Sequence, residues 1–502
     1  MMRARSADGH DWLKAAEVAR ISRGRLLHGD GDARRVTTDT RDLQRGDCFV
    51  ALQGDRFDGH DHALEALARG AAGVIVSKRV QPDAVPAGCF VVEVDDTFEA
   101  LAALATECRR RSGATVVGIT GSCGKTTTKE MLGHVLASAM PVVRSPRSFN
   151  NRIGVPLTLF QLQPDTAAAV VEIGTNGPGE IAQLTAIAEP DIAIVTCVAE
   201  SHLEGLGSIR GVAREKASLV AGVRAGGVAI LNGDDPACLE MASAHDARPV
   251  MVRVGGEADW FATDVEVCGM STAFRLQGDR RVVLPVLGIH NVYNALLTIA
   301  AAVELGMELD VVLAALSRVA PARRRLQPVS AGDVTIFDDT YNMNPASARA
   351  GLDALCGLPD GGRRVAVFGG MAELGASASD LHRALGEHVA RSGVDLLITV
   401  GNEALGIAKG ARDAGMASGR VHCAPTVAAA EGVVRRLVVP SDRVLCKASR
   451  RYGLDQLVDR LVALAEEPRT SREEAAGGPS RAGHHQDQMT SQVPVDRSAL
   501  NS

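Results

Sequence analysis

The chain has 502 residues, of which 46% are hydrophobic and 23% charged, and its formal net charge is −6. One hydrophobic core does not ordinarily support such a length, so we expect about three domains. The longest apolar runs, such as Val365–Phe368, are too short to cross a membrane. The slight negative charge gives no support for binding nucleic acid or an anionic membrane. We therefore expect a soluble protein, monomeric, with small-molecule partners.

The ten cysteines are scattered, and no two form a Cys-X-X-Cys pair. Neither a zinc cluster nor a disulfide framework is indicated. Most of them lie in apolar patterns, where a free thiol acts as a small hydrophobic side chain. The first ten residues are not followed by the apolar segment of a secretory signal. A reducing compartment, the cytoplasm, fits these observations.

Alternating strand and helix patterns predict an α/β fold with parallel sheets. In the first region, residues 48–52 and 72–77 read as strands, and residues 61–70 between them as a helix that Gly70 closes. Two further sheets are predicted from the apolar runs that follow. The strands of the second sheet are expected at residues 114–120, 167–174, 191–198 and 226–235. Those of the third sheet are expected at residues 334–339, 363–370, 394–401 and 442–449. The expected divisions are an N-terminal domain over 1–111, a central domain over 112–322, a Rossmann-like domain over 323–466 and a disordered tail over 467–502. Residues Val311–Gln327 are expected to form the hinge between the last two sheets.

The sharpest motif is VVGITGSCGKTTTKEML, in which a buried strand leads through a glycine-containing loop into a helix over Lys125–Ala137. Glycines let backbone N–H groups and the helix N-terminus approach a polyphosphate. Lys125 can then neutralise the β and γ phosphates, and the Thr126 hydroxyl can bind Mg²⁺. The loop fits a short GxxGKT pattern, because Ile119 stands where the longer pattern needs glycine. The alternative is an ordinary turn with a solvated lysine, and a kinase, a motor or a ligase would share this loop.

The residues also single out three side chains downstream and one cysteine inside the loop. Glu172 and His202 follow neighbouring parallel strands, so both can face the nucleotide and hold Mg²⁺. Taken alone, His202 is more typical of a surface loop, and Lys216, in the middle of a helix pattern, of a solvated face. Cys123 stands before a helix N-terminus and a lysine, which favour a thiolate, so it is expected to be the most reactive cysteine unless it points inward.

Taken together, ordered motifs over roughly residues 36 to 465 resemble the Mur ligase family. They are TDTRDLQRGDCFVALQGDRFDGHDH, TGSCGKTTTKEML, SFNNRIGVPLTL, VEIGTNGPGEI, SHLEGLGSIRGVAREK, LNGDDP, GIHNVYNALLTIAAAVELG, RRRLQP, DDTYNMNPASARAGLDAL, GGMAELGASASDLH and CKASRRYGLDQLV. The run DDTYNMNP is the most discriminating, because it is similar to the DDxYNANP run of family members that add D-alanyl-D-alanine. The DNPR signature of the members that add the third peptide residue is not found.

The resemblance implies three domains: one for a UDP-sugar, one ATPase sheet and one Rossmann-like sheet. It implies Lys125, Lys216 and His202 as catalytic residues, with Lys216 carbamylated by CO₂, and Thr40 with Arg41 near the UDP-sugar. The implied magnesium ligands are Thr126, Glu172, His202 and Lys216. The implied ATP-site residues are Gly121, Ser122, Cys123, Gly124, Lys125, Thr126, Thr127, Asn150, Asn151, His290, Asn291, Asn294, Arg325, Asp339 and Tyr341.

The implied activity is an ATP- and Mg²⁺-dependent ligation of D-alanyl-D-alanine to UDP-N-acetylmuramoyl-tripeptide in peptidoglycan precursor synthesis. The sequence departs from the family pattern at Gly370, where aspartate is usual, at Cys446 and Ala448, and at Phe149 and Cys123. We consider two rival hypotheses. One is another ligase of the superfamily, such as a folylpolyglutamate or third-residue-adding enzyme, and the run DDTYNMNP argues against it. The other is a non-catalytic nucleotide-binding protein, and the joint presence of Lys125, Glu172, His202 and Lys216 argues against it.

Overall fold

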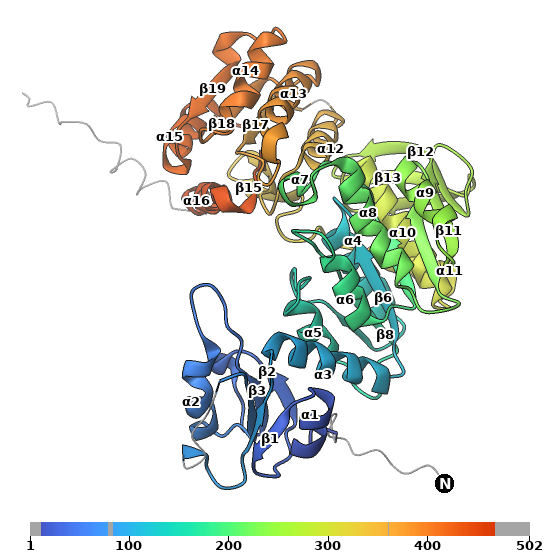
Figure 1. The fold of residues 1–502 in the computed structure, drawn as a ribbon. Helices are drawn as coiled ribbons and strands as arrows, with labels where there is room; N and C mark the ends of the chain where they lie inside the picture. The colour runs from blue at the N-terminus through green and yellow to red at the C-terminus, as the bar shows by residue number, and fades with distance from the viewer. Residues whose placement is uncertain (1–11, 79–83, 360, 467–502) are drawn as a thin grey trace, which may run out of the picture.

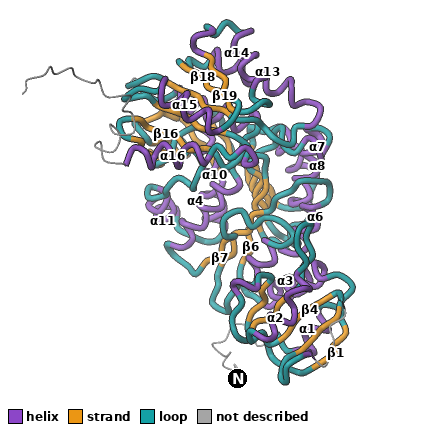
Figure 2. Tube along the Cα trace, turned by 90° about the vertical axis from the view of Figure 1, so that its left-hand side faces the viewer, coloured by secondary structure: helices purple, strands orange, loops and turns teal. Residues whose placement is uncertain are grey.

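The computed structural model describes residues 12–78, 84–359 and 361–466. Three sheets of five, nine and six strands follow one another along the chain. Figure 1 shows them as three bodies, with the first in blue, the second in green and yellow and the third in orange. From the side, the first and third bodies lie at opposite ends of the molecule (Figure 2). The α/β fold predicted from the sequence is confirmed, and the predicted tail lies outside the described residues.

The first sheet has the order β1-β5-β4-β3-β2, with β1 antiparallel to β5 and the other pairs parallel. Both predicted strands and the predicted helix are present, as β3, β4 and α2. The elements are β1 (Arg25–His28), β2 (Arg35–Thr37), β3 (Asp47–Val50), β4 (Gly73–Val76), β5 (Phe90–Glu93), α1 (Ala15–Ile21), α2 (Ala63–Ala68) and α3 (Thr97–Arg111).

Helix α3 connects the first body to the second. The Asp96 side chain accepts hydrogen bonds from the backbone of Phe98 and Glu99 and so caps the helix. Buried α3 residues such as Leu101 and Leu104 belong to one apolar core that runs from Val18 of the first body to Leu219 of the second. The first two sheets therefore share a core through this helix.

Arg109 near the end of α3 is 3% exposed and holds this junction together. Its guanidinium donates to Asp191 at 2.7 Å and to three carbonyl oxygens at 3.1–3.3 Å, those of Ala114, Ala188 and Glu189. We expect Arg109→Met to lower the free energy of unfolding by about 3 kcal/mol, because it removes a buried guanidinium that bonds one carboxylate and three carbonyl oxygens across this junction. The neighbouring exposed pair Arg110–Glu189 provides the control, and Arg110→Met should cost less than about 1 kcal/mol. Urea unfolding of both variants checks this, and equal effects would contradict it.

The second sheet has the order β14-β13-β12-β11-β10-β9-β6-β8-β7. Helices α4, α10 and α11 pack on one face, and α3, α5, α6 and α8 on the other. Its strands are β6 (Thr115–Thr120), β7 (Val142–Arg144), β8 (Ala168–Glu172), β9 (Ile192–Val195), β10 (Val228–Asn232), β11 (Arg248–Val254), β12 (Trp260–Cys268), β13 (Ser271–Leu276) and β14 (Arg280–Leu284). Its helices are α4 (Lys125–Ala137), α5 (Gly154–Leu159), α6 (Glu180–Ala188), α7 (Leu203–Leu206), α8 (Ile209–Ala221), α9 (Pro236–Ala244), α10 (Ile289–Glu304) and α11 (Leu309–Leu316).

The third sheet has the order β15-β16-β20-β17-β18-β19, parallel except at its edge strand β15. Its strands are β15 (Gln327–Ala331), β16 (Val334–Asp339), β17 (Arg364–Phe368), β18 (Leu396–Val400), β19 (Val421–Ala424) and β20 (Arg443–Lys447). Its helices are α12 (Pro345–Cys356), α13 (Ala378–Arg391), α14 (Leu405–Asp413), α15 (Val427–Leu437) and α16 (Asp455–Glu466).

The connector between the last two sheets is shorter than the sequence predicted. Residues 311–316 belong to α11, whose Val312 and Leu316 are buried in the core of the second body. The irregular link is therefore residues 317–326, and its motion as a hinge stays a prediction. Among the described residues, no helix is long and apolar enough to span a membrane.

Candidate active site

The loop between β6 and α4 has the shape of a phosphate-binding loop. Gly121 (φ 147°) and Gly124 (φ 85°) adopt backbone conformations that favour glycine. A Cβ added at Gly121 would lie 1.8 Å from the Thr196 hydroxyl, so no larger residue fits there. Lys125 begins α4, and its ammonium donates to the Gly121 carbonyl at 2.6 Å. The backbone and the lysine are thus arranged to receive an anion at the helix N-terminus.

Strand β9 holds this loop in place. The backbone N–H of Ser122 donates to the Cys197 carbonyl at 2.8 Å, and the Thr196 hydroxyl donates to the Cys123 carbonyl. The Ser122 hydroxyl donates to the Ala199 carbonyl at 2.8 Å. These contacts hold the loop in its shape without a ligand.

A cavity of about 220 Å³ opens beside the loop and is lined by both the second and the third sheet. The second body contributes Ser122–Gly124, Thr126, Thr127 and the α10 residues His290, Asn291 and Asn294. Burial lowers the pKa of His290 to about 4, so its ring is neutral at physiological pH. Asn294 accepts from the Thr128 hydroxyl at 3.1 Å and donates to Asn291 at 2.9 Å, which fixes both amides at the cavity wall. The structure therefore brings these predicted nucleotide residues together.

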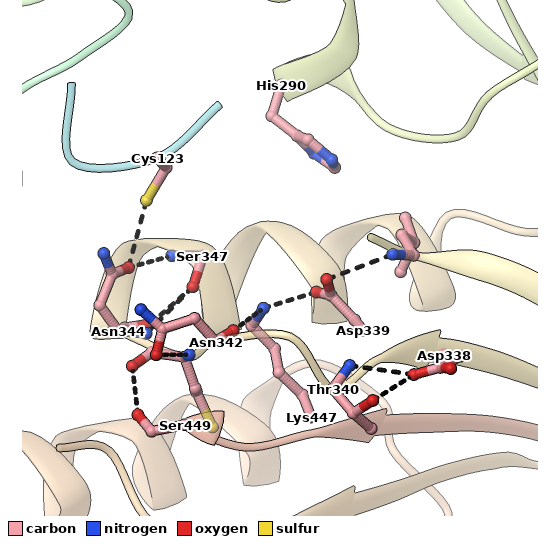
Figure 3. Close-up of polar contacts among 12 residues, drawn as sticks. Cys123, His290, Asp338, Asp339, Thr340, Asn342, Asn344, Ser347, Lys447 and Ser449 are labelled. Atoms are coloured by element: carbon pink, nitrogen blue, oxygen red, sulfur yellow. Dashed lines mark hydrogen bonds and ion pairs between the residues drawn. The ribbon is translucent and has the colours of Figure 1, made fainter. Parts of the chain in front are cut away.

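The third sheet closes the other side of the cavity with a polar network that Figure 3 shows. Lys447, at the end of β20, is 1% exposed, and its ammonium contacts Asp339 at 2.6 Å and the Asn342 carbonyl at 3.0 Å. Asn344 caps α12 and also reaches the phosphate loop: its amide donates to the Ser122 carbonyl at 3.2 Å, and its oxygen accepts from the Cys123 thiol at 3.2 Å. The sequence analysis placed Asp339 here but missed Asn344 and Lys447. An Asn-X-X-Ser capping pattern and a lysine ending an apolar strand were the available signals.

Arg325 and Tyr341 form a second contact between the bodies. The Arg325 guanidinium donates to the Thr126 hydroxyl at 3.4 Å and stacks on the Tyr341 ring at 4.2 Å. The Arg450 guanidinium lies 5.4 Å from the same ring. Stacking of this kind holds a guanidinium in place while leaving its N–H groups available to an anion.

Glu172, at the end of β8, is buried beside the predicted asparagine pair. One carboxylate oxygen accepts from the Asn150 amide at 2.9 Å, and the other lies 3.5 Å from the Lys129 ammonium. That second oxygen has no hydrogen-bond donor among the described residues, so its lone pairs fit a divalent cation. Asn151 instead accepts from the backbone N–H groups of Ile153 and Gly154, at the start of α5.

His202 lies on the opposite side of the loop, before α7. Its Nδ1 is 2.5 Å from the carboxylate of Glu373, which belongs to the third body, and this contact lowers the pKa of Glu373. Within the described ranges, no three His, Cys, Asp or Glu side chains converge as a metal site. The predicted set of Thr126, Glu172, His202 and Lys216 holds one imidazole and one carboxylate, and magnesium binding there stays a prediction.

Lys216, in α8, is 1% exposed, so the solvated position that its helix pattern favoured is wrong. Burial, and next the positive charge of Lys125, lower its pKa to about 7. The adjacent Glu215 accepts from the backbone N–H groups of Gly179 and Ile181 at 2.7 and 2.8 Å, which fixes this part of the helix. Near pH 7, Lys216 is therefore a neutral amine in a large fraction of the molecules. Only the neutral amine has the lone pair with which the nitrogen can react as a nucleophile.

Family models match most of the chain in the order of its three sheets. They are the Mur ligase family catalytic domain over residues 33–109, the Mur ligase middle domain over 119–302 and the Mur ligase glutamate ligase domain over 324–450. The UDP-N-acetylmuramoyl-tripeptide–D-alanyl-D-alanine ligase of Escherichia coli K12 is 38% identical, over 77% of this chain and 86% of its own. The ligase of the same name from Mycobacterium tuberculosis H37Rv is also 38% identical, over 90% and 98%. The chain belongs to the Mur ligase family.

Solved structures of this family have the same overall arrangement. MurF from Acinetobacter baumannii superposes with a TM-score of 0.82 at 30% identity, covering 91% of this chain and 100% of that one. MurF from Thermotoga maritima in complex with ADP superposes with a TM-score of 0.77 at 28% identity, covering 86% of this chain and 98% of that one. The three-sheet architecture is therefore the Mur ligase fold.

The Mur ligase residues predicted for the UDP-sugar lie in the first body. Thr40 and Arg41 follow β2 in a short turn, which the Asp39 carboxylate caps by accepting from the Arg41 backbone at 2.9 Å. The same carboxylate pairs with the Arg41 guanidinium at 2.7 Å, and the arginine side chain is 88% exposed. An exposed guanidinium can accept a new anionic partner, and the role of both residues stays a prediction.

Three of the departures from the Mur ligase pattern, at Gly370, Cys446 and Ala448, lie in the third body. A Cβ added at Gly370 would lie 2.6 Å from the Tyr452 ring, so the tyrosine occupies the space of a larger side chain. A Cβ added at Gly369 would likewise lie 2.6 Å from the Cβ of Ala448. Cys446 is fully buried on β20, where burial raises the pKa of its thiol. These residues shape the third body and leave the phosphate loop untouched.

Proposed function

We propose that this Mur ligase joins D-alanyl-D-alanine to UDP-N-acetylmuramoyl-tripeptide and hydrolyses ATP to ADP and phosphate. The carrying observation is the cavity in which the phosphate loop faces Asp339, Asn344 and Lys447 of the third body. Asp339 and Asn344 belong to the run DDTYNMNP, which separates this activity from its sister ligases. Relatives that carry this name are 34–38% identical over most of the chain, which supports the same substrates. We place this step in the cytoplasm, in the wall synthesis that underlies cell shape and division.

We further propose that the three bodies divide the work at residues 111/112 and 322/323. The first, with Thr40 and Arg41, takes the UDP-sugar; the second binds ATP; and the third brings the dipeptide. A carboxylate does not acylate an amine at neutral pH, because oxide is too poor a leaving group. Transfer of the γ-phosphoryl group to the tripeptide carboxylate gives an acyl phosphate, and the dipeptide amine then displaces phosphate.

The residues of this chain would promote that reaction in two ways: positive charges would stabilise the transferred phosphoryl group, and closure of the site would exclude water. Lys125, the Arg325 guanidinium and the loop N–H groups would stabilise the charge on the moving phosphoryl group. Magnesium, held by Thr126, Glu172, His202 and the carbamate of Lys216, would neutralise further negative charge there. The contacts of Asn344 with Ser122 and of His202 with Glu373 close the third body over the loop, which protects the acyl phosphate from water.

The proposal is tested by acceptor-dependent phosphate release from the purified full chain with Mg-ATP and UDP-N-acetylmuramoyl-tripeptide. We expect release to require D-alanyl-D-alanine, with single amino acids, a diamino acid and glutamate giving no more than background. The mass of the product should equal tripeptide plus dipeptide less water. Preference for a diamino acid with a UDP-dipeptide donor, or for glutamate with a folate, would assign the chain to a sister activity. Release independent of any acceptor would refute the ligase proposal.

A further inference from the structure

Two cysteines from distant parts of the sequence meet at the phosphate loop. Cys123 lies within the loop, Cys197 follows β9, and both line the nucleotide cavity. The Cys197 thiol donates a hydrogen bond to the Cys123 carbonyl oxygen at 3.8 Å, so the two residues are in direct contact. The ligase reaction uses neither thiol, since the loop binds phosphate through backbone N–H groups and Lys125.

The backbone around these cysteines already holds them side by side. The Ser122 N–H donates to the Cys197 carbonyl at 2.8 Å, and the Thr196 hydroxyl donates to the Cys123 carbonyl. A disulfide requires the two Cα atoms to lie about 4.4–6.8 Å apart, so that bridging needs no large backbone movement. Because these hydrogen bonds join the two segments at both cysteines, bridging would need only local rearrangement of the side chains.

The surroundings also distinguish the two sulfurs chemically. The neighbouring Cys197 thiol and the positive charges of Lys125 and Lys447 lower the pKa of Cys123 against the effect of burial. The pKa of Cys197 is raised, by its contact with Cys123 and by burial. Cys123 is therefore the attacking sulfur, and Cys197 is the thiol that stands ready to resolve the product.

We propose that Cys123 and Cys197 form a reversible disulfide that switches off the nucleotide site. The oxidant is a small disulfide RSSR. The Cys123 thiolate attacks one sulfur to give Cys123–S–SR and RS⁻. Cys197 then loses its proton and attacks the Cys123 sulfur, giving Cys123–S–S–Cys197 and a second RS⁻. Both cysteines are oxidised, and RSSR is reduced to two thiols.

The disulfide would act on nucleotide binding and on closure together. Its sulfurs would occupy the cavity wall at the phosphate loop, where ATP must approach the backbone. The Cys123 thiol would also be withdrawn from Asn344, which now accepts its hydrogen bond across the two bodies at 3.2 Å. Bound Mg-ATP covers the loop and should therefore protect both thiols from oxidation.

The test uses 2-hydroxyethyl disulfide, a small neutral oxidant, on the full-length wild type with and without Mg-ATP. After oxidation, we expect the mass of the protein to fall by that of two hydrogen atoms, and a digest to contain a crosslinked peptide with Cys123 and Cys197. ATP-dependent phosphate release should fall by about 10²-fold or more. Dithiothreitol should restore the mass and the activity. The activity of each variant is compared with that of its own untreated sample. The crosslink is identified by mass, so its assignment does not depend on the proposed substrates.

Three variants separate this proposal from general thiol damage. Cys197→Ser should stop at a mixed disulfide on Cys123, whereas Cys123→Ser should give neither adduct nor crosslink at the loop. The matched control is Cys268→Ser, which removes an exposed thiol and should behave as wild type. Thermal melting of each variant checks that it is folded. A crosslink elsewhere, no crosslink at all, or equal oxidation with and without Mg-ATP would overturn the proposal.

Discussion

Replacing Lys125 with alanine is expected to abolish turnover, with a loss of about 10³-fold or more in kcat/KM. The ammonium lies at the first turn of α4 and contacts the Gly121 carbonyl at 2.6 Å, so it sits where the loop presents its N–H groups. In the mechanism that we propose, this cation would neutralise charge on the β and γ phosphates and on the transferred phosphoryl group. Its removal leaves the developing negative charge to Arg325 and the backbone.

The measurement is steady-state phosphate release together with ADP affinity by calorimetry. Lys409→Ala, an exposed lysine on α14 far along the chain, serves as the control and should be unchanged. Both variants should melt as the wild type does, because Lys125 is only half-buried. Phosphate release within about tenfold of wild type by Lys125→Ala would mean that ATP is not used at this loop.

Lys216→Arg should fail as completely as Lys216→Ala, each losing about 10³-fold in kcat/KM. The proposed species is a carbamate, an anion that forms only on a neutral amine. Burial and the charge of Lys125 lower the Lys216 pKa to about 7, so the neutral form is abundant at physiological pH. A guanidinium keeps its proton under these conditions and forms no carbamate.

Labelled bicarbonate gives a readout that is independent of turnover. With ¹³C-bicarbonate, the wild type should show a carbamate carbon signal that strengthens as pH rises through about 7, where the free amine becomes the main form. Neither Lys216 variant should show it. Arg214→Lys, an exposed position on the same helix, is the control for helix α8 and should keep the signal and the activity. A largely active arginine variant would mean that Lys216 acts as an ordinary cation.

The elements that were predicted correctly from the sequence are those whose structure is determined by their own local residue pattern. Strand β6, the glycine loop and α4 were predicted together, because a fully apolar run, two glycines and a GKT start are local signals. The alternating outer strands β12 to β14 were not predicted. In β12 and β14 the side chains alternate between more and less exposed positions, so these strands lack the continuous apolar run of a strand covered on both faces. In β13, polar residues interrupt the apolar ones.

The site residues divide in the same way. Lys125 and Thr126 follow from the loop itself, whereas the burial of Lys216 depends on how α8 packs against the second sheet. The contacts of Asn344 with the loop, and of His202 with Glu373, join residues more than 150 positions apart. Such contacts are fixed by how the bodies are arranged, and no periodicity or spacing in the sequence records that arrangement. The resemblance named residues of this region without giving their partners.

The contact between Gly370 and Tyr452 constrains how this chain can change over evolution. An aspartate at 370, the residue usual in the family, would place its Cβ within 2.6 Å of the tyrosine ring. That substitution is therefore accessible only after Tyr452 has been replaced by a smaller residue or has moved. Conversely, while the Tyr452 ring fills this space, Gly370 cannot be replaced by a residue with a side chain unless the ring moves. We therefore expect the effect of a substitution at 370 to depend on which residue stands at 452.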